Sequence, residues 1–393
     1  MSKYDFESII DRRNSNSVKW HVADNELPMW IADMDFATAP EILTALQKKI
    51  TLGTFGYEEP DDNYFDAIIA WFKQRHHVNI QSEWLNFVTG VIPALSSVVR
   101  RLSHVGDNVV VMTPVYDIFF HSIENNGRHV LESPLKYDTD TNHYEIDWHN
   151  LETQLAEPLS TLLILCNPHN PVGKTWSQKT LSRLLLLCRK HGVTVVSDEI
   201  HGDVVLGEPS YQSLLSLPVE QLHNAVVIFS PSKAFNVAAL HAASVVVPDK
   251  SLRETVMRGI NNDELAEPNL VALEGSMAAY QKGEKWLDAL IEQLQYNRHQ
   301  VEIFLHDHLP QLKFASENAT YLLWLDVSAV TENSSDLVKH LRKTTGLVLS
   351  AGNIYRGNGE KFVRINIACP RQLLSDGLMR LSRGIKTYAN VKQ

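Results

Sequence analysis

Through the middle of the chain, short runs of apolar residues alternate with segments in which apolar residues recur every three or four positions. The apolar runs predict strands, and the periodic segments predict helices that bury one face. We expect strands at 108–112, 159–166, 193–197, 225–229 and 242–247, and helices at 118–126 and 177–190. Short apolar strands that alternate with helices are typical of a mostly parallel sheet covered on both faces. The pattern therefore predicts an α/β fold.

The pattern changes after about residue 252, where the helical segments become longer and the strands fewer. We expect helices at 264–281, 285–309, 335–345 and 371–388, with strands at 320–327 and 361–367. This arrangement indicates a smaller α+β unit. The first forty or so residues are rich in Trp and Met and show little periodicity. We therefore predict an N-terminal arm with part of the small domain (1–48), a large domain (49–283) and a small C-terminal domain (284–393).

Charge and composition narrow the possible function classes. The chain has 36 Lys and Arg against 46 Asp and Glu, and its net charge of −10 argues against nucleic-acid or anionic-membrane binding. Its three cysteines form no CxxC pair, which is typical of buried thiols in a reducing compartment. We expect a cytoplasmic protein, because no signal-peptide pattern or membrane-length apolar run is present. The histidine pairs His76-His77 and His306/His308 lie in polar, helix-like segments, and no metal site is expected.

The segment Phe229–Asn236 carries the strongest chemical signal. Lys233 follows the predicted strand 225–229 after a turn that contains Ser230 and Ser232. Open α/β sheets bind ligands at the carboxyl ends of their strands, so the amine and both hydroxyls are expected to face a ligand. The amine could form a Schiff base and the hydroxyls could hold a phosphate, which together fit pyridoxal phosphate. A surface lysine after a strand is the alternative interpretation.

Two other strand ends supply polar groups. Asn170 lies in the segment 167–173, where two Asn-Pro steps and a glycine predict an irregular turn, and its amide could donate to a cofactor oxygen. Asp198 and His201 follow another strand, where a carboxylate can keep a pyridine nitrogen protonated and the histidine can reach the same ligand. The alternatives are a plain loop at Asn170 and a helix N-cap at Asp198.

Three further features could complete a ligand site. Gly90 and Val91 begin a predicted helix whose free backbone N–H groups could bind a phosphate. Tyr116 follows a strand and could place its ring against a flat cofactor. Arg364 lies in the middle of an apolar strand, where an arginine is expected to meet an anion such as a carboxylate. The respective alternatives are an ordinary loop-to-helix junction, a core tyrosine and a buried ion pair.

The order of these motifs resembles a known family. Fold-type I pyridoxal-phosphate enzymes of the class I/II aminotransferase superfamily have motifs similar to TGVIPAL, TPVYDIFF, NPHNPVG, SDEIHGD, SPSKAFN and FVRINIA. Within that superfamily, the chain resembles the cystathionine β-lyase (C–S lyase) branch most closely. This closer resemblance lies in the segments DRRNSNSVKW, LPMWIADMDFATAP and FGYEEP, in His201 and in the SPSKAFN form of the lysine motif. The resemblance spans about residues 4–385. It implies an aminotransferase-like large domain with a mostly parallel sheet, plus a smaller α+β domain.

The resemblance also implies a role for each matched position. Lys233 would bond to pyridoxal phosphate and move the substrate Cα proton, with Asp198 on the pyridine nitrogen and Tyr116 stacked on the ring. Asn170 would contact the phenolic oxygen and the substrate, whose α-carboxylate Arg364 would bind. The remaining cofactor contacts would come from backbone N–H groups, hydroxyls, an imidazole and a residue of the neighbouring subunit, namely Gly90, Val91, Ser230, Ser232, His201 and Tyr57.

The activity that the resemblance implies is a C–S β-lyase. It would cleave L-cystathionine and related cysteine S-conjugates to a thiol (homocysteine), pyruvate and ammonia, as a homodimer with shared sites. An aminotransferase with the same site is the alternative, and a regulator that binds a transcription factor is a third hypothesis. Two positions depart from the pattern of many relatives: His201 replaces a tyrosine, and His241 replaces a phosphate-binding arginine. The role of His241 stays open.

Overall fold

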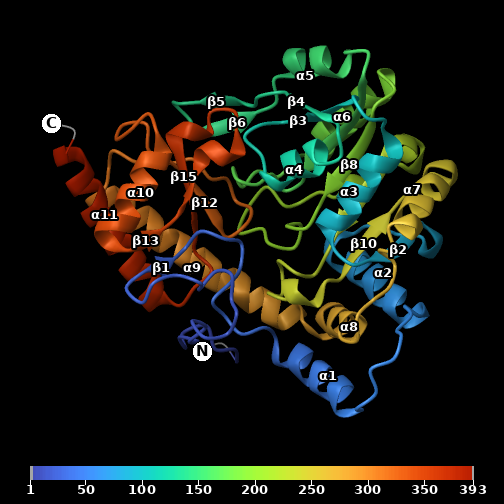
Figure 1. Ribbon diagram of the computed structural model, residues 1–393, viewed down its shortest axis with the longest axis horizontal. Coiled ribbons are helices and arrows are strands. Elements are labelled where there is room, and N and C mark those ends of the chain that lie inside the picture. Colours follow the sequence, from blue (N-terminus) through green and yellow to red (C-terminus); the bar gives the residue numbers. More distant parts are fainter. Residues whose placement is uncertain (1–2, 392–393) are drawn as a thin grey trace.

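A seven-stranded sheet forms the centre of the protein, whose computed structural model describes residues 3–391 (Figure 1). Its strand order is β2 (Leu85–Val88), β10 (Ala243–Val246), β9 (Ala225–Phe229), β8 (Thr194–Asp198), β7 (Ser160–Cys166), β3 (Asn108–Val111), β4 (His129–Glu132). Strand β10 runs antiparallel to both neighbours, and every other pair is parallel. The expected mostly parallel sheet is confirmed, and the five predicted strands match their observed bounds within one or two residues.

The inner strands β7, β8, β9 and β10 are buried on both faces, which explains why they read as apolar runs, whereas the edge strand β4 is partly exposed. Along β9, Val226 and Ile228 join one hydrophobic cluster, whereas Val227 and Phe229 join the other. On the first face lie α3 (Val91–Leu102), α4 (Ile118–Glu124) and α7 (Lys250–Asn262). On the second face lie α2 (Asp62–His76) and α6 (Gln178–Lys190). Burial of both faces fixes the sheet between two helical layers.

A second, antiparallel sheet forms the core of the C-terminal part. Its order is β11 (Lys313–Phe314), β12 (Leu322–Asp326), β15 (Phe362–Asn366), β14 (Ser350–Ala351). Around it lie α9 (Glu284–His308), α10 (Ser334–Thr345) and α11 (Arg371–Val391) (Figure 1). The small α+β unit expected from the sequence is therefore present.

The N-terminal segment joins both parts of the molecule. Strand β1 (Leu27–Pro28) pairs in parallel with β13 (Leu347–Val348) of the C-terminal part. The next helix, α1 (Pro40–Thr51), lies against α8 (Ala272–Lys282) (Figure 1). The remaining elements are a hairpin of β5 (Lys136–Asp138) with β6 (His143–Glu145), and α5 (Trp148–Leu155). The domain boundaries at residues 48 and 283 stay a prediction.

One helix starts later than the sequence pattern predicts. A helix was expected from residue 264, but α8 begins at Ala272. Glu264 has a positive φ of 54°, and Pro268 removes a backbone donor that a helix would need. The Asn269 side chain accepts from Val271 N and donates to Leu240 O, at 3.1 and 2.7 Å. These side-chain bonds give the backbone an alternative to the helix, so the apolar period alone was misleading.

Candidate active site

The carboxyl ends of the parallel strands meet at one edge of the large sheet, as the fold requires. A cavity of about 200 Å³ lies there. Its wall includes most of the site residues predicted from the sequence, namely Gly90, Val91, Tyr116, Asn170, Asp198, His201, Ser230, Ser232 and Lys233. These residues come from five separate motifs, so the fold brings together groups that lie far apart in the chain.

Lys233 lies in the turn after β9, and its side chain points into this cavity. Its Nζ donates a hydrogen bond of 2.8 Å to the backbone carbonyl of Ala32. Burial lowers the pKa of Lys233 to about 8. The negative charges of Asp33 and Asp198 oppose this shift, whereas the positive charge of Arg364 adds to it. A neutral amine is therefore accessible near neutral pH, as a nucleophile or a base requires.

Asp198 is the last residue of β8 and is buried in the cavity wall. Burial raises its pKa to about 7, although the N–H of Ile200, which donates to Oδ1 at 3.1 Å, lowers it. Turns follow Asp198, and no described helix begins directly after it, so the helix-cap alternative does not fit. A buried carboxyl group with no charged hydrogen-bond donor among the described residues is suited to meet a cationic ligand atom.

His201 and Tyr116 face the cavity as uncharged groups. The His201 Nδ1 is buried, and no described residue forms a hydrogen bond with it. Burial lowers the pKa of His201 to about 3, and the nearby charges of Lys233 and Arg364 act in the same direction. Burial raises the pKa of Tyr116, so its phenol stays protonated. Both rings are therefore available to a ligand as neutral surfaces or hydrogen-bonding groups.

One end of the cavity is suited to an anion. Helix α3 begins at Val91, and no side chain caps the N–H groups of its first turn. Ser230 and Ser232 lie beside it, with their Oγ atoms 2.7 Å apart. His241 also lines this cavity, so the position that departs from the family pattern does face the ligand. Backbone N–H groups and hydroxyls therefore lie together at this end of the cavity, where they could donate to an anion.

Arg364 reaches the site from the other sheet. It lies in the middle of β15, where Nη1 donates to Asn170 Oδ1 at 3.1 Å and Nη2 to the carbonyl of Trp30 at 3.0 Å. Its buried Nε has no hydrogen-bond partner among the described residues. Both acceptors are neutral, so the alternative of a structural ion pair is not supported. The guanidinium can still accept a carboxylate.

The loop that carries Asn170 is held by a close approach of backbones. Gly173 has a φ of 68°, and a Cβ there would lie 2.8 Å from the carbonyl oxygen of Ala319. Ala319 N in turn donates to Gly173 O at 2.9 Å. A glycine is required for this contact, because it allows both the positive φ and the short distance. The contact docks the loop on the C-terminal part and brings Asn170 to Arg364.

Arg364 does not line the cavity itself but contacts its wall through Asn170. Tyr57 is the predicted site residue that lies apart from the cavity. Its side chain is fully exposed, in an irregular segment between α1 and α2, and it does not line the cavity. The prediction assigns Tyr57 to the site of a neighbouring subunit, and it stays a prediction.

Sequence reasoning missed several residues of the cavity wall. Ala32 lines it from the N-terminal segment, and Ile200 and Ala238 add apolar surface. No pattern of apolar residues marks Ala32, because its contribution is a backbone carbonyl. Among the described residues, no group of His, Cys, Asp or Glu is arranged to hold a metal ion. In the same part of the chain, no helix is long and apolar enough to cross a bilayer.

Comparison with known proteins assigns the family. The model of the family "Aminotransferase class I and II" matches residues 27–381. The cystathionine beta-lyase PatB of Bacillus subtilis is 39% identical over 97% of this chain and 99% of its own. Cystalysin from Treponema denticola, whose structure contains pyridoxal 5'-phosphate, superposes with a TM-score of 0.94 at 28% identity over 98% and 99% of the chains. A C–S lyase of Staphylococcus hominis superposes with a TM-score of 0.90 at 30% identity over 97% and 99%. This chain therefore belongs to the class I and II aminotransferase family, in its cystathionine beta-lyase, or C–S lyase, branch.

Proposed function

We propose that the protein is a pyridoxal-phosphate-dependent C–S β-lyase. Its substrates would be L-cystathionine and related cysteine S-conjugates, which react with water to give a thiol (homocysteine from cystathionine), pyruvate and ammonia. The observation that carries the proposal is the pair of buried groups Lys233 and Asp198, which lie in one cavity and form no ion pair with any residue that the structure describes. The likeness to a cystathionine beta-lyase and to two C–S lyase structures supports the same reaction.

The residues present fit pyridoxal phosphate. The cofactor has an aldehyde, a ring nitrogen that can carry a proton, and a phosphate. Lys233 would bond to the aldehyde, the Asp198 carboxylate would pair with the protonated nitrogen, and the α3 N-terminus with Ser230 and Ser232 would hold the phosphate. Tyr116, Asn170 and His201 would contact the ring and its phenolic oxygen. The buried Nδ1 of His201, which has no hydrogen-bond partner in the described part of the chain, is an independent sign that a polar ligand belongs there.

Each residue then has a defined task in the elimination. When bound, the cofactor supplies an electron sink that stabilises negative charge at the substrate Cα. The Lys233 amine removes the Cα proton, and its lowered pKa suits this work near neutral pH. Arg364 orients the substrate by binding its α-carboxylate, with Nε as a free donor. Asn170 links the cofactor cavity to Arg364, because it lines the cavity and accepts a hydrogen bond from the Arg364 guanidinium.

The same groups could also run transamination, which is the alternative function. The family model that matches the chain is that of aminotransferases. Both reactions begin with loss of the substrate Cα proton. They differ afterwards, because elimination requires a leaving group on Cβ and transamination does not. The regulatory hypothesis has no support in any residue of the site. We also propose a cytoplasmic homodimer with shared active sites.

A product assay without any keto acid tests the proposal. The purified protein with pyridoxal phosphate should release pyruvate and thiol from cystathionine in equal amounts, and Lys233→Ala should release neither. An aminotransferase would be silent until a keto acid is added. A protein without activity under both conditions, or one that develops no visible absorbance with pyridoxal phosphate, contradicts the proposal.

A further inference from the structure

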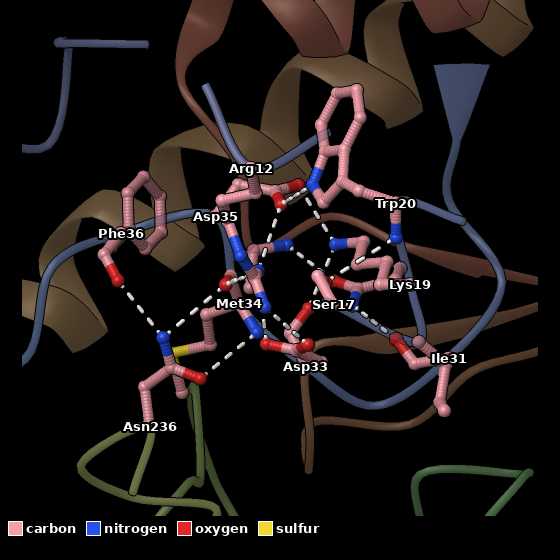
Figure 2. A network of polar contacts seen from close by, with 12 residues as sticks. Arg12, Ser17, Lys19, Trp20, Ile31, Asp33, Met34, Asp35, Phe36 and Asn236 are labelled. Carbon is pink, nitrogen blue, oxygen red and sulfur yellow. Dashed lines mark hydrogen bonds and ion pairs between the residues drawn. The ribbon is translucent and has the colours of Figure 1, made fainter. Parts of the chain in front are cut away.

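Residues Met29–Phe36, here called the strap, form neither helix nor strand, yet they are buried or half-buried, and Ala32 of this segment lines the active-site cavity. A loop away from solvent must satisfy its backbone carbonyls with other groups. Side chains from distant parts of the chain do this here, as Figure 2 shows for Arg12, Lys19 and Asn236. The position of the strap is therefore set by tertiary contacts rather than by its own secondary structure.

The strap carbonyls are held from both sides of the active site. On the side of the lysine turn, Asn236 Nδ2 donates to Phe36 O at 2.8 Å and to Met34 O at 3.2 Å. On the side of β15, Arg364 donates to Trp30 O at 3.0 Å. A buried ion pair of 2.7 Å between Lys19 and Asp35 fixes the strap further (Figure 2). The lysine turn and strand β15, which carries Arg364, thus both form hydrogen bonds with the strap.

Asn366 contacts the strap on both sides of Ala32, the residue whose carbonyl Lys233 contacts. It lies on β15 and is 1% exposed. Its Nδ2 donates to Ile31 O at 2.7 Å and to Asp33 O at 2.8 Å, and its Oδ1 accepts from Ala368 N at 2.7 Å. One amide therefore holds the two carbonyls that flank Ala32. The carbonyl between them, that of Ala32, accepts the hydrogen bond of Lys233 Nζ at 2.8 Å.

We propose that Asn366 is a positioning residue, which fixes the Ala32 carbonyl through its neighbours and so sets the place and the proton affinity of the Lys233 amine. Asn366 does not touch Lys233, the cavity or a ligand position, so it acts only through the strap. The inference deepens the proposed function, because it concerns the amine to which that function assigns the chemistry.

The direction of the effect follows from the groups around Lys233. They are Asp33 on the strap, Asp198 on β8, His201 in the turn after it and Arg364 on β15. Burial lowers the pKa of Lys233 to about 8, and Asp33 opposes this shift. A carbonyl acceptor also favours the ammonium form. When the strap shifts, both favourable contacts weaken and the pKa falls further.

The variant Asn366→Leu removes the amide at similar size, and the chain offers a matched control. Asn297 is fully buried, its Nδ2 donates to Ile367 O and Cys369 O at 2.8 and 2.9 Å, and its Oδ1 accepts from Gln293 at 2.9 Å. Asn297→Leu therefore removes the same kinds of bonds at the same burial, but none to the strap. Arg12, Lys19 and Asn236 still donate to carbonyls of the strap in both variants, so we expect the strap to stay attached and to shift only locally, around Ala32.

The measurement is the pH dependence with which trace acetic anhydride labels Lys233 in full-length protein freed of cofactor, read by mass spectrometry of its peptide. For Asn366→Leu the midpoint should fall by about one pH unit, so that labelling at pH 7 rises about five-fold over the wild type. Asn297→Leu should match the wild type. In the loaded enzyme, kcat of Asn366→Leu should fall more than KM changes, because the contacts of Arg364 remain.

Equal midpoints in Asn366→Leu and Asn297→Leu, or a raised midpoint in Asn366→Leu, would overturn the proposal. If Asn366→Leu does not fold, Asn366→Ser takes its place; its hydroxyl can restore one donation, and a smaller shift in the same direction is expected. The labelling result does not depend on the reaction. If the midpoint shifts in Asn366→Leu but the wild type has no lyase activity, the role of Asn366 is supported and the proposed function is refuted. If the wild type is an active lyase but the midpoint does not shift, the proposed function is supported and the role of Asn366 is refuted.

Discussion

Lys233 and Asp198 show how burial alone prepares single residues for chemistry. Removal from water disfavours the charged form of each, so the pKa of the amine falls to about 8 and that of the carboxyl rises to about 7. Each of the two groups can therefore change its protonation state near neutral pH. Groups with such shifts in one cavity are typical of active sites.

Asp198 should make the stability of the cofactor-free protein depend on pH. Its folded pKa of about 7 lies above its ordinary value of 3.8, so the folded chain binds more protons between these values. Stability is then full below about pH 4 and is lost as the pH rises towards 7, by at most on the order of 4 kcal/mol. The asparagine side chain in Asp198→Asn cannot titrate. The melting temperature of this variant, relative to that of the wild type, should therefore rise between pH 4.5 and pH 7.5. Parallel curves would contradict the buried, cation-free environment.

Asp198→Asn should also separate catalysis from cofactor retention. The neutral amide cannot keep a ring nitrogen protonated, so turnover should fall by orders of magnitude while bound pyridoxal phosphate, measured by absorbance, changes much less. Near-normal elimination would return Asp198 to a purely structural role.

Arg364 should act mainly on substrate affinity. A charged, bidentate contact contributes about 1.5–3 kcal/mol, so Arg364→Ala should raise KM for cystathionine roughly 10- to 100-fold. Arg364→Lys keeps the charge but not the fork, and an intermediate KM is expected. Circular dichroism would confirm that both variants fold. An unchanged KM in folded Arg364→Ala would contradict the proposal that Arg364 binds the substrate α-carboxylate.

At the scale of elements, the site depends on where two different sheets end. The parallel strands β3, β7, β8 and β9 bring their carboxyl ends to one edge, whereas β15 contributes Arg364 from the middle of an antiparallel strand. The loop after β7 joins the two, through the Gly173–Ala319 contact and an ion pair of 2.7 Å between Lys174 and Glu317. The geometry of the site is therefore sensitive to this loop.

Gly173→Ala should weaken the junction more than an ordinary loop substitution does. The left-handed φ costs any alanine about 1–2 kcal/mol, and the approach of 2.8 Å to Ala319 O adds a clash. Gly192→Ala is the control, because its φ of 71° is similar but no atom lies within 4 Å of its Cβ. In urea denaturation, Gly173→Ala should lose more stability than Gly192→Ala, and it alone should lose substrate affinity. Equal losses would show that the backbone contact is unimportant.

At the scale of the whole molecule, a single chain leaves aromatic surface uncovered next to an irregular segment. Phe55 is 73% exposed and Tyr57 is fully exposed, between α1 and α2. Exposed aromatic residues of this kind are typical of interaction sites. A two-fold symmetric partner would cover them and could let each subunit complete the other's site.

Mixing two inactive variants tests this arrangement. Tyr57→Ala and Lys233→Ala should each be impaired, and subunit exchange should restore activity, because a mixed dimer has one site with both native groups. Light scattering would establish the dimer, and native mass spectrometry of isotope-labelled subunits would verify exchange. Full activity in a monomer, or no recovery after verified exchange when Tyr57→Ala alone is inactive, would refute the shared site.

The sequence by itself was sufficient for the five inner strands of the sheet and for many residues of the cavity wall, whereas the edge strands β2 and β4 were not predicted. Strands buried on both faces are largely apolar, so their positions could be recognised from local pattern. The polar residues at or after their ends, such as Asp198 and Lys233, could be recognised as candidates, whereas the order of the strands in the sheet came from the structure. The family motifs added roles to positions such as Asn170 and Arg364. In each case the information lies within a few consecutive residues, which is the range over which periodicity and turn chemistry act.

Only the tertiary structure decided the contacts that join distant segments. The carbonyl of Ala32 reaches Lys233, and Asn366 holds the strap, although nothing in the apolar pattern distinguishes either residue. The late start of α8 has the same origin, since the side chain of Asn269 bonds to the distant Leu240. Backbone carbonyls are identical in every residue, so their partners follow from the packed fold and not from the side chains of the local sequence.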